Sequence, residues 1–130
     1  MSDIQEVGIG RTTANVTTTT DGEEVAVISE VVKVTRPEMR VLIFAEITFD
    51  SGASTTGIIP RIRLGTTILG TLKSEANTHE TTAALMETWS VSALDEVSGV
   101  DEVQYCATLE AVAGAADGTI HNATILVLLI

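Results

Sequence analysis

The chain has 130 residues, a net charge of −11 and 45% hydrophobic residues, with only 19% of its residues charged. A chain of this length forms one domain with a sizeable core, and its apolar content excludes a disordered protein. Eighteen acidic residues against seven lysines and arginines leave no basic surface. We therefore expect no binding to nucleic acid or to an anionic membrane.

The residue types favour strands over helices. Aromatic residues make up 3% of the chain, so aliphatic residues must form the core, and the β-branched ones favour strands. The single cysteine, Cys106, excludes an intrachain disulfide. Neither a signal peptide nor a long apolar segment is apparent, so we expect a soluble cytosolic product without cofactors. The acidic composition, with Lys33 and Lys73 as the only lysines, resembles that of high-salt organisms, although an ordinary acidic surface fits equally well.

Residues 1–22 carry few large apolar side chains, and a threonine-rich run there ends in the turn-forming pair Asp21 and Gly22. We predict an extended N-terminal arm over residues 1–22 and a β-sandwich domain over residues 23–130. Such an arm either frays in solvent or lies along a neighbouring subunit. The candidate contact residues along it are Ile4, Val7, Ile9, Arg11 and Val16.

Two strands are predicted in the next segment. Residues 24–35 are rich in β-branched residues, but the apolar positions change face near Ser29 and Glu30, which indicates a bulge before Pro37 ends the strand. Residues 41–49 alternate strictly between apolar and other residues, a period of two that a helix cannot maintain. The residues expected to face the core are Val41, Ile43, Ala45, Ile47 and Phe49.

A hairpin is predicted after a loop at residues 50–54. Residues 58–64 alternate between aliphatic residues and two outward arginines, and Pro60 indicates an edge strand because it cannot donate a ladder hydrogen bond. Residues 65–67 would turn the chain into a returning strand at residues 68–72. The polar residues 73–82 would then form a crossover, as jelly-roll topologies require.

The C-terminal half contains three further predicted strands. Residues 83–94 place four apolar residues on one face, with Glu87 as an unexplained polar interruption and a helix as the main alternative. A turn at residues 95–101 leads to residues 103–111, whose alternation predicts a half-buried strand. The last strand covers residues 119–130.

The last six residues, ILVLLI, are apolar on both faces of the last strand. A strand with this pattern must be covered from both sides, because an exposed row of leucines would promote aggregation. One side would be the core and the other a second copy of the chain. The residues expected to face the core are Ile125, Val127 and Leu129, and those expected to form the oligomer interface are Leu126, Leu128 and Ile130.

Three segments of the C-terminal half, TWSVSALDEVSG, VQYCATLEA and ADGTIHNATILVLLI, resemble structural proteins of tailed viruses of bacteria or haloarchaea. The resemblance extends from about Ala83 to Ile130 and more loosely over residues 41–72. It implies a jelly-roll fold similar to that of tumour necrosis factor, and a homotrimer. It also implies a place on the outer surface of a virion made in the host cytoplasm, with the major capsid protein or other virion proteins as partners.

Candidate sites for chemistry are few. A nucleophilic pair would need Cys106 beside His79 or His121, and nothing in the pattern indicates an activated thiol, so we expect no enzyme. The two histidines lack metal-ligand spacing. Four carboxylates crowd one predicted turn, and such oxygens can bind calcium, although their spacing matches no calcium loop. This candidate ion site consists of Asp95, Glu96, Asp101 and Glu102.

Two virion functions fit the sequence, and an enzymatic function is the third interpretation to weigh. A capsid decoration protein is the first interpretation. The second is a receptor-binding or adhesion head, in which the loops at residues 50–57 and 73–82 contact glycans, with Trp89 and Tyr105 as the available aromatic platforms. The third, a cupin-like enzyme, would need more clustered histidines than the two present.

Overall fold

The computed structural model describes residues 6–12, 16–18, 23–50, 57–82, 85–99, 101–112 and 118–130. Over these residues the chain forms ten strands and no helix, so none of the described segments is a helix that could cross a membrane. The predicted all-β class is confirmed. The strands are β1 (Glu6–Thr12), β2 (Val16–Thr18), β3 (Glu24–Lys33), β4 (Met39–Asp50), β5 (Gly57–Leu64), β6 (Leu72–Glu75), β7 (His79–Glu80), β8 (Met86–Val97), β9 (Glu102–Ala111) and β10 (Gly118–Leu129).

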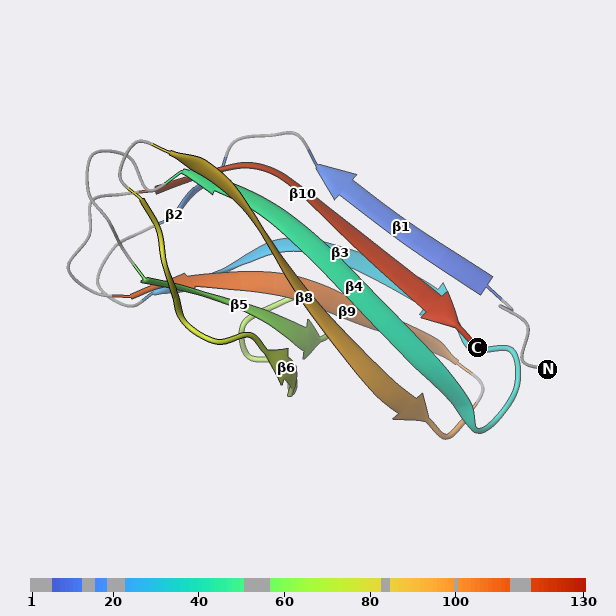
Figure 1. The fold of residues 1–130 in the computed structure, drawn as a ribbon. Coiled ribbons are helices and arrows are strands. Elements are labelled where there is room, and N and C mark those ends of the chain that lie inside the picture. The colour runs from blue at the N-terminus through green and yellow to red at the C-terminus, as the bar shows by residue number, and fades with distance from the viewer. Residues whose placement is uncertain are drawn as a thin grey trace.

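The strands form two antiparallel sheets that stack as a sandwich (Figure 1). Sheet A has the order β1-β10-β4-β8, with β2 also paired to β10, and sheet B has the order β3-β9-β5-β6, with β7 also paired to β5. Because β1 and β2 share one position and β6 and β7 another, each sheet has four positions. From β2 to β5 and again from β7 to β10, each strand lies in the other sheet from the one before it. This is the jelly-roll topology, as the sequence predicted.

The core lies between the sheets and is mainly aliphatic. In β4 the burial alternates as predicted, with Val41, Ile43, Ala45 and Ile47 fully buried and Phe49 1% exposed. The core-facing residues of the last strand are also fully buried as predicted: Ile125, Val127 and Leu129.

Gly118, the first residue of β10, lies directly against the ring of Phe49. A Cβ atom at this position would stand 2.1 Å from Phe49 Cζ, so only glycine fits without a shift of the ring.

The predicted arm is corrected where the structure describes it, because β1 and β2 belong to sheet A. Both pair with β10 on the side opposite β4 and so form one edge of the sheet. Glycines and a threonine run weaken the strand pattern there, which is why the sequence indicated an arm. Ile4 lies outside the described residues. The register pairs Val7 with Leu128, Ile9 with Leu126, Arg11 with Thr124 and Val16 with Ile120.

The predicted edge position of β5 is wrong, because β5 pairs with β9 on one side and with β6 and β7 on the other. Pro60 is tolerated because its missing donor faces the break between β6 and β7. Its carbonyl, which points the same way, accepts a hydrogen bond of 3.0 Å from Ala76 N in that break. Pro60 therefore lies at a local edge within an interior strand.

Four other features differ in detail from the predictions. The bulge in β3 lies between Ala26 and Ile28, slightly before the predicted position. The returning strand after the hairpin turn begins only at Leu72, so the predicted strand at 68–72 is mostly turn. Strand β8 replaces the helix alternative and continues to Val97, into the predicted turn. Strand β9 is buried on both faces from residue 105 to 109, although half-burial was predicted.

Candidate interaction surface

The outer face of sheet A carries a continuous band of large apolar side chains across β10, β4 and β8. In β4, the residues between the core-facing ones point away from the core, and their register partners in the neighbouring strands do the same. One row of the band consists of Leu128, Leu42 and Leu94. In the next row the band consists of Leu126 and Phe44, and their neighbour on β8 is Ser92.

These side chains are only partly covered by the chain itself. Leu42 is 36% exposed, Phe44 39% and Leu94 58%. The residues predicted for the oligomer interface, Leu126, Leu128 and Ile130, are half-buried. They lie on the face away from the core, and the structure places Leu42, Phe44 and Leu94 beside them. A partly wet aliphatic band on one sheet face is typical of an interaction surface.

Most of the rest of this face is polar, and the exposed Met86, opposite Asp50, lies apart from the band. Thr48 and Thr88 face each other across β4 and β8 with their hydroxyl oxygens 2.9 Å apart. Asn122, opposite Thr48 on β10, is exposed. Glu46 separates these residues from the apolar band. The apolar band therefore occupies one end of sheet A rather than its whole outer face.

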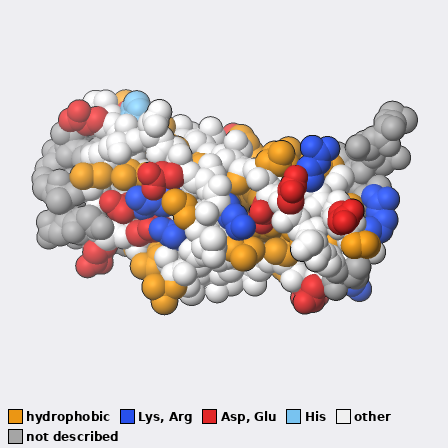
Figure 2. Space-filling view, turned by 90° about the horizontal axis from the view of Figure 1, so that it is seen from below, with side chains coloured by type: hydrophobic (Ala, Val, Ile, Leu, Met, Phe, Trp, Pro, Cys, Tyr) orange, Lys and Arg blue, Asp and Glu red, His pale blue; other side chains and the backbone are white. Residues whose placement is uncertain are grey.

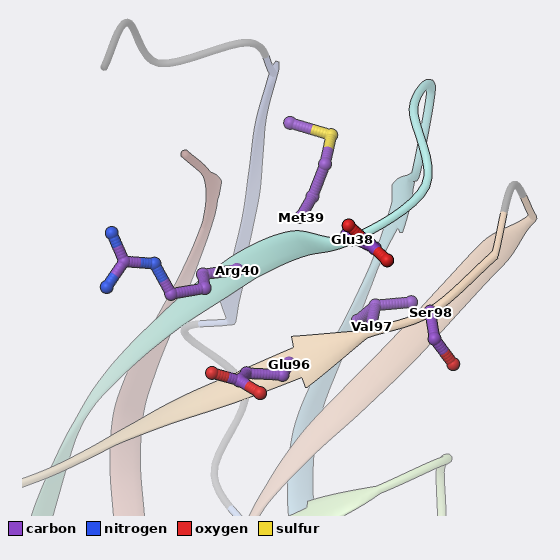
Figure 3. A pocket seen from close by; sticks show the side chains of 6 residues that line it. All are labelled: Glu38, Met39, Arg40, Glu96, Val97 and Ser98. Atoms are coloured by element: carbon purple, nitrogen blue, oxygen red, sulfur yellow. The ribbon is translucent and has the colours of Figure 1, made fainter. Parts of the chain in front are cut away.

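An open hollow of about 690 Å³ adjoins the apolar band at the end of sheet A. Arg40 lies opposite Glu96 in the register, and Figure 3 shows these two side chains on adjacent strands, extending in the same direction. Arg40 N and O exchange hydrogen bonds with Ile130 O and N at 3.2 and 3.0 Å. The hollow is thus rimmed by charges of both signs. Its lining residues are Glu38, Met39, Arg40, Glu96, Val97 and Ser98.

The outer face of sheet B is covered by a cluster of ion pairs, which we call the arginine cluster. Arg61 on β5 contacts Glu24 on β3 at 3.0 Å, Glu110 on β9 at 2.8 Å and Glu75 on β6 at 2.6 Å. Arg63 binds both carboxylate oxygens of Glu24, at 2.7 and 2.9 Å. The cluster therefore ties all four positions of sheet B together. Figure 2 shows acidic and basic side chains side by side on the face seen from below.

Glu24 is the centre of the arginine cluster. Its side chain is 10% exposed, and it also accepts a hydrogen bond from Thr108 Oγ1. Burial alone would raise the pKa of Glu24, but the hydrogen bonds from Arg63 and Thr108 and the charges of Arg63 and Arg61 outweigh it. The pKa is therefore lower than usual. Glu24 stays ionised, and the buried charges compensate one another.

The turn between β5 and β6, residues 65–71, folds back over the outward face of β9. Cys106 faces away from the core, and its Sγ donates to Thr67 O at 3.8 Å. Arg63 Nη1 donates to Gly70 O at 3.0 Å, which connects the turn to the arginine cluster. At the tip of the turn, Leu69 is 91% exposed. The turn thus buries β9 while presenting a leucine to solvent.

The four residues of the predicted ion site are separated by their strand positions. Asp95 points between the sheets, where Tyr105 Oη donates to it at 2.7 Å and Lys73 Nζ at 3.2 Å. Glu96, the next residue, lies on the outer face of sheet A, and Asp101 and Glu102 are exposed. Within the described residues, no three acidic, histidine or cysteine side chains form a group that could hold a metal ion.

The candidate nucleophile and the two histidines lie in different environments. Cys106 is fully buried, and burial raises the pKa of its thiol, which disfavours the thiolate. The ring of His79 lies against that of Trp89, with centroids 3.7 Å apart and the planes tilted by 39°, and His121 Nε2 lies 3.9 Å from Asp50 Oδ2. The Cys106 thiol instead donates to Thr67 O in the β5–β6 turn.

Sequence reasoning missed the contribution of β4 and β8 to the interaction surface. The signal was present in the alternation: if Ile43 and Ala45 face the core, Leu42 and Phe44 must face outward. What the sequence did not give was the register that sets Leu42 beside Leu128 and Leu94. The arginine cluster was also missed, since its members are distant in the sequence.

No family model matches the sequence, and no curated protein matches it. Solved structures of infectious bursal disease virus do match. A chain of the Gx strain has a TM-score of 0.66 and 10% identity, over 98% of this chain and 34% of that one. The VP2 subviral particle has a TM-score of 0.65 and 8% identity, over 98% of this chain and 34% of that one. A chain of the T=1 particles has a TM-score of 0.63 and 11% identity, over 100% of this chain and 33% of that one.

The chain therefore spans about a third of the length of the virus chains that it matches. At this level of identity the likeness concerns the fold. It confirms the predicted jelly-roll sandwich and shows that chains of virus particles contain the same fold.

Proposed function

We propose that this chain is a non-enzymatic structural protein of a virus particle, which binds the outer surface of the assembled capsid as an oligomer and stabilises it. The fold shared with chains of virus particles supports the virion role. The observation that carries the proposal is the apolar band on the outer face of sheet A. It is made of Leu42, Phe44, Leu94, Leu126 and Leu128.

The apolar band is best covered by other copies of the same chain. Each large aliphatic side chain moved from water into an interface contributes about 1.5–3 kcal/mol when fully buried. The half-buried residues of β10 would gain part of this, and Leu94, at 58% exposure, more. A homotrimer around the sheet A faces is the state we expect, because three copies around an axis cover all three bands at once.

The stabilising effect follows from mass action. A subunit that binds the assembled lattice but not the free capsid protein shifts the equilibrium toward the lattice, in proportion to its free concentration over its Kd. No catalytic group is needed for this function. The acidic surface, with its net charge of −11, keeps the free subunit soluble until it meets the lattice.

The receptor-binding alternative has less support from the described residues. Glycan sites commonly use an exposed aromatic side chain as a platform. Tyr105 is fully buried in the core, and Trp89 is half-buried between the sheets against His79. Residues 51–56, part of one candidate loop, lie outside the described residues.

The oligomer is tested by sedimentation at one protein concentration. Leu128→Asp or Leu94→Asp would place an unpaired carboxylate in the interface, which costs several kcal/mol and should convert the trimer to a monomer. Asn122→Asp is the matched control, since it adds the same charge to the polar part of the same face and should leave the trimer intact. A monomeric wild type, or trimeric Leu128→Asp and Leu94→Asp variants, would show that the apolar band is not an interface.

The virion role is tested on purified particles of the virus that encodes the chain. An antibody against the recombinant protein should label intact particles at regular positions, and heat should open labelled particles at a higher temperature than particles without the protein. Particles that lack the chain, or equal heat stability with and without it, would contradict the proposal.

A further inference from the structure

The β5–β6 turn and the first residue of β6 expose three large aliphatic side chains close together. Leu69 at its tip is 91% exposed, and its neighbours Ile68 and Leu72 are 40% and 45% exposed. The turn lies on the outer face of sheet B, because Thr67 O accepts from Cys106, which faces away from the core. It therefore lies on the sheet opposite the one that carries the apolar band.

The conformation of the turn is closely specified by the rest of the chain. Leu64 N donates to Thr71 O at 2.9 Å, and Gly65 N donates to Gln104 O on β9 at 2.7 Å. Within the turn, Gly70 N donates to Thr67 O at 3.1 Å, and Leu69 N donates to Thr67 Oγ1 at 3.2 Å.

Two glycines are required by this conformation. Gly65 has a φ of 100°, in the left-handed region, and a Cβ on Gly70 would stand 1.8 Å from Leu64 O. Arg63, itself held by Glu24, fixes the carbonyl of Gly70. A turn fixed in this way presents Leu69 in one orientation, so little conformational entropy is lost when a partner binds it.

The surface of the turn is uncharged, although the chain carries a net charge of −11. Residues 65–72 read GTTILGTL, so hydroxyl groups surround the aliphatic tip. Such a surface fits a small apolar pocket with polar groups at its rim. It does not suit an anionic lipid surface, which attracts basic rather than acidic proteins.

We propose that the β5–β6 turn is the contact through which the oligomer binds the assembled capsid, with Leu69 inserted into an apolar pocket repeated over the capsid surface. This inference rests on the proposed function, because binding to a capsid requires a contact surface and the turn would supply it. The contact has to be repeated, since a stable single interface buries roughly 800 Å² per partner and three aliphatic side chains on one turn cannot reach that area.

The location of the turn matches this role. Copies that associate through their sheet A faces keep their sheet B faces outward, so each copy presents one Leu69. Several weak contacts made at once raise the apparent affinity far above that of one contact, but only toward a surface that repeats its pockets at a suitable spacing. The free capsid protein offers one pocket and would bind weakly, which gives the preference for the assembled lattice.

The inference is tested by co-sedimentation with shells assembled from the major shell protein of the same virus. Leu69→Ser should bind at least a hundredfold more weakly than wild type, because the loss at each contact is multiplied over the oligomer. Its sedimentation coefficient and Tm should remain those of wild type. Leu85→Ser, which alters a 50% exposed leucine outside both surfaces, is the matched control and should bind normally.

Each other outcome has a distinct meaning. Wild-type binding with equal binding by Leu69→Ser would overturn the role of the turn and leave the proposed function intact. Absence of wild-type binding to shells would overturn the proposed function itself. A smaller oligomer for Leu69→Ser would assign the turn to contacts between copies, and binding of wild type but not Leu69→Ser to phosphatidylglycerol vesicles would assign it to lipid. Both of these results would overturn the inference.

Discussion

The two outer faces of the sandwich are covered in different ways. On sheet B, the chain covers its own outer face with the arginine cluster and the β5–β6 turn, and β9 is buried on both faces from residue 105 to 109. On sheet A, β10 has aliphatic residues on both faces, yet Leu126 and Leu128 on its outer face remain half-buried. Strand β9 of sheet B is thus covered on both faces within the chain, whereas β10 of sheet A is fully covered on one face only.

This difference indicates where a partner is needed. The charged groups of the arginine cluster find their partners within the same chain, so they need no second copy, although the β5–β6 turn beside them still exposes Leu69. Aliphatic side chains on sheet A lose only part of their contact with water in a single copy. The stability of the fold should therefore depend on sheet B interactions, while assembly should depend on sheet A.

The largest expected effect on stability is at the centre of the arginine cluster. Glu24→Gln would leave the nearby guanidinium groups of Arg61 and Arg63 without their shared carboxylate. Removing one partner of a buried ion pair costs about 3–5 kcal/mol, and we expect the lower end because Arg61 keeps Glu110 and Glu75. The cost is measured as the difference in the free energy of unfolding by urea between chains with and without Glu24→Gln. Both chains also carry Leu94→Asp, which is expected to keep them monomeric.

Glu46→Gln provides the control for this comparison. It removes the same charge from the exposed outer face of sheet A and should change the free energy of unfolding by less than about 0.5 kcal/mol. Equal losses for Glu24→Gln and Glu46→Gln would mean that overall charge, rather than the arginine cluster, sets the stability.

Acid should remove the contribution of Glu24. Because the pKa of Glu24 is lowered in the folded protein, the unfolded chain binds a proton at this carboxyl more readily. The stabilisation is complete above the unfolded value of about 4.3 and is lost as the pH falls through the lower folded pKa. The difference in unfolding free energy between wild type and Glu24→Gln should thus be constant from neutral pH down to about 5 and shrink below about 4.3.

That difference is measured by urea unfolding at a series of pH values in the same monomeric background. A difference that stays constant far below the unfolded carboxyl pKa would show that Glu24 stabilises the fold without its charge.

Strands with a clear period of two were predictable from the sequence, whereas contacts between distant residues were not. The alternation in β4 and β10 fixed which residues face the core. The arginine cluster depends on pairs 37 and 39 residues apart, Glu24 with Arg61 and with Arg63. No local pattern contains such a contact, since it arises only when β9 brings β3 and β5 to its two sides.

Glu87, the unexplained interruption in the predicted strand, has an explanation in the sheet order. Strand β8 is an edge of sheet A, and Glu87 and Asp95 both lie on its inward-facing side. Inward charges on an edge strand discourage pairing with another chain, because such pairing would bury them further. The sequence shows the charge, but only the sheet order shows that β8 lies at an edge.

The smallest expected effect is that of salt, which should act on the whole surface and leave the arginine cluster unchanged. With a net charge of −11, the acidic groups repel one another, and raising NaCl from about 0.1 M to 1 M shortens the screening length from about 10 Å to about 3 Å. We expect Tm to rise by a few degrees, the equivalent of about 1 kcal/mol for a domain of this size.

In contrast, the difference in unfolding free energy between wild type and Glu24→Gln should stay the same across this salt range. The side chains of Glu24 and Arg61 are 10% and 11% exposed, so salt screens their interaction only weakly. Thermal and urea unfolding at fixed protein concentration measure both quantities. A Tm that is indifferent to NaCl would exclude adaptation to high salt. A loss of the Glu24→Gln difference at 1 M would mean that the arginine cluster is open to solvent, and the contrast between the two faces would then fail on the sheet B side.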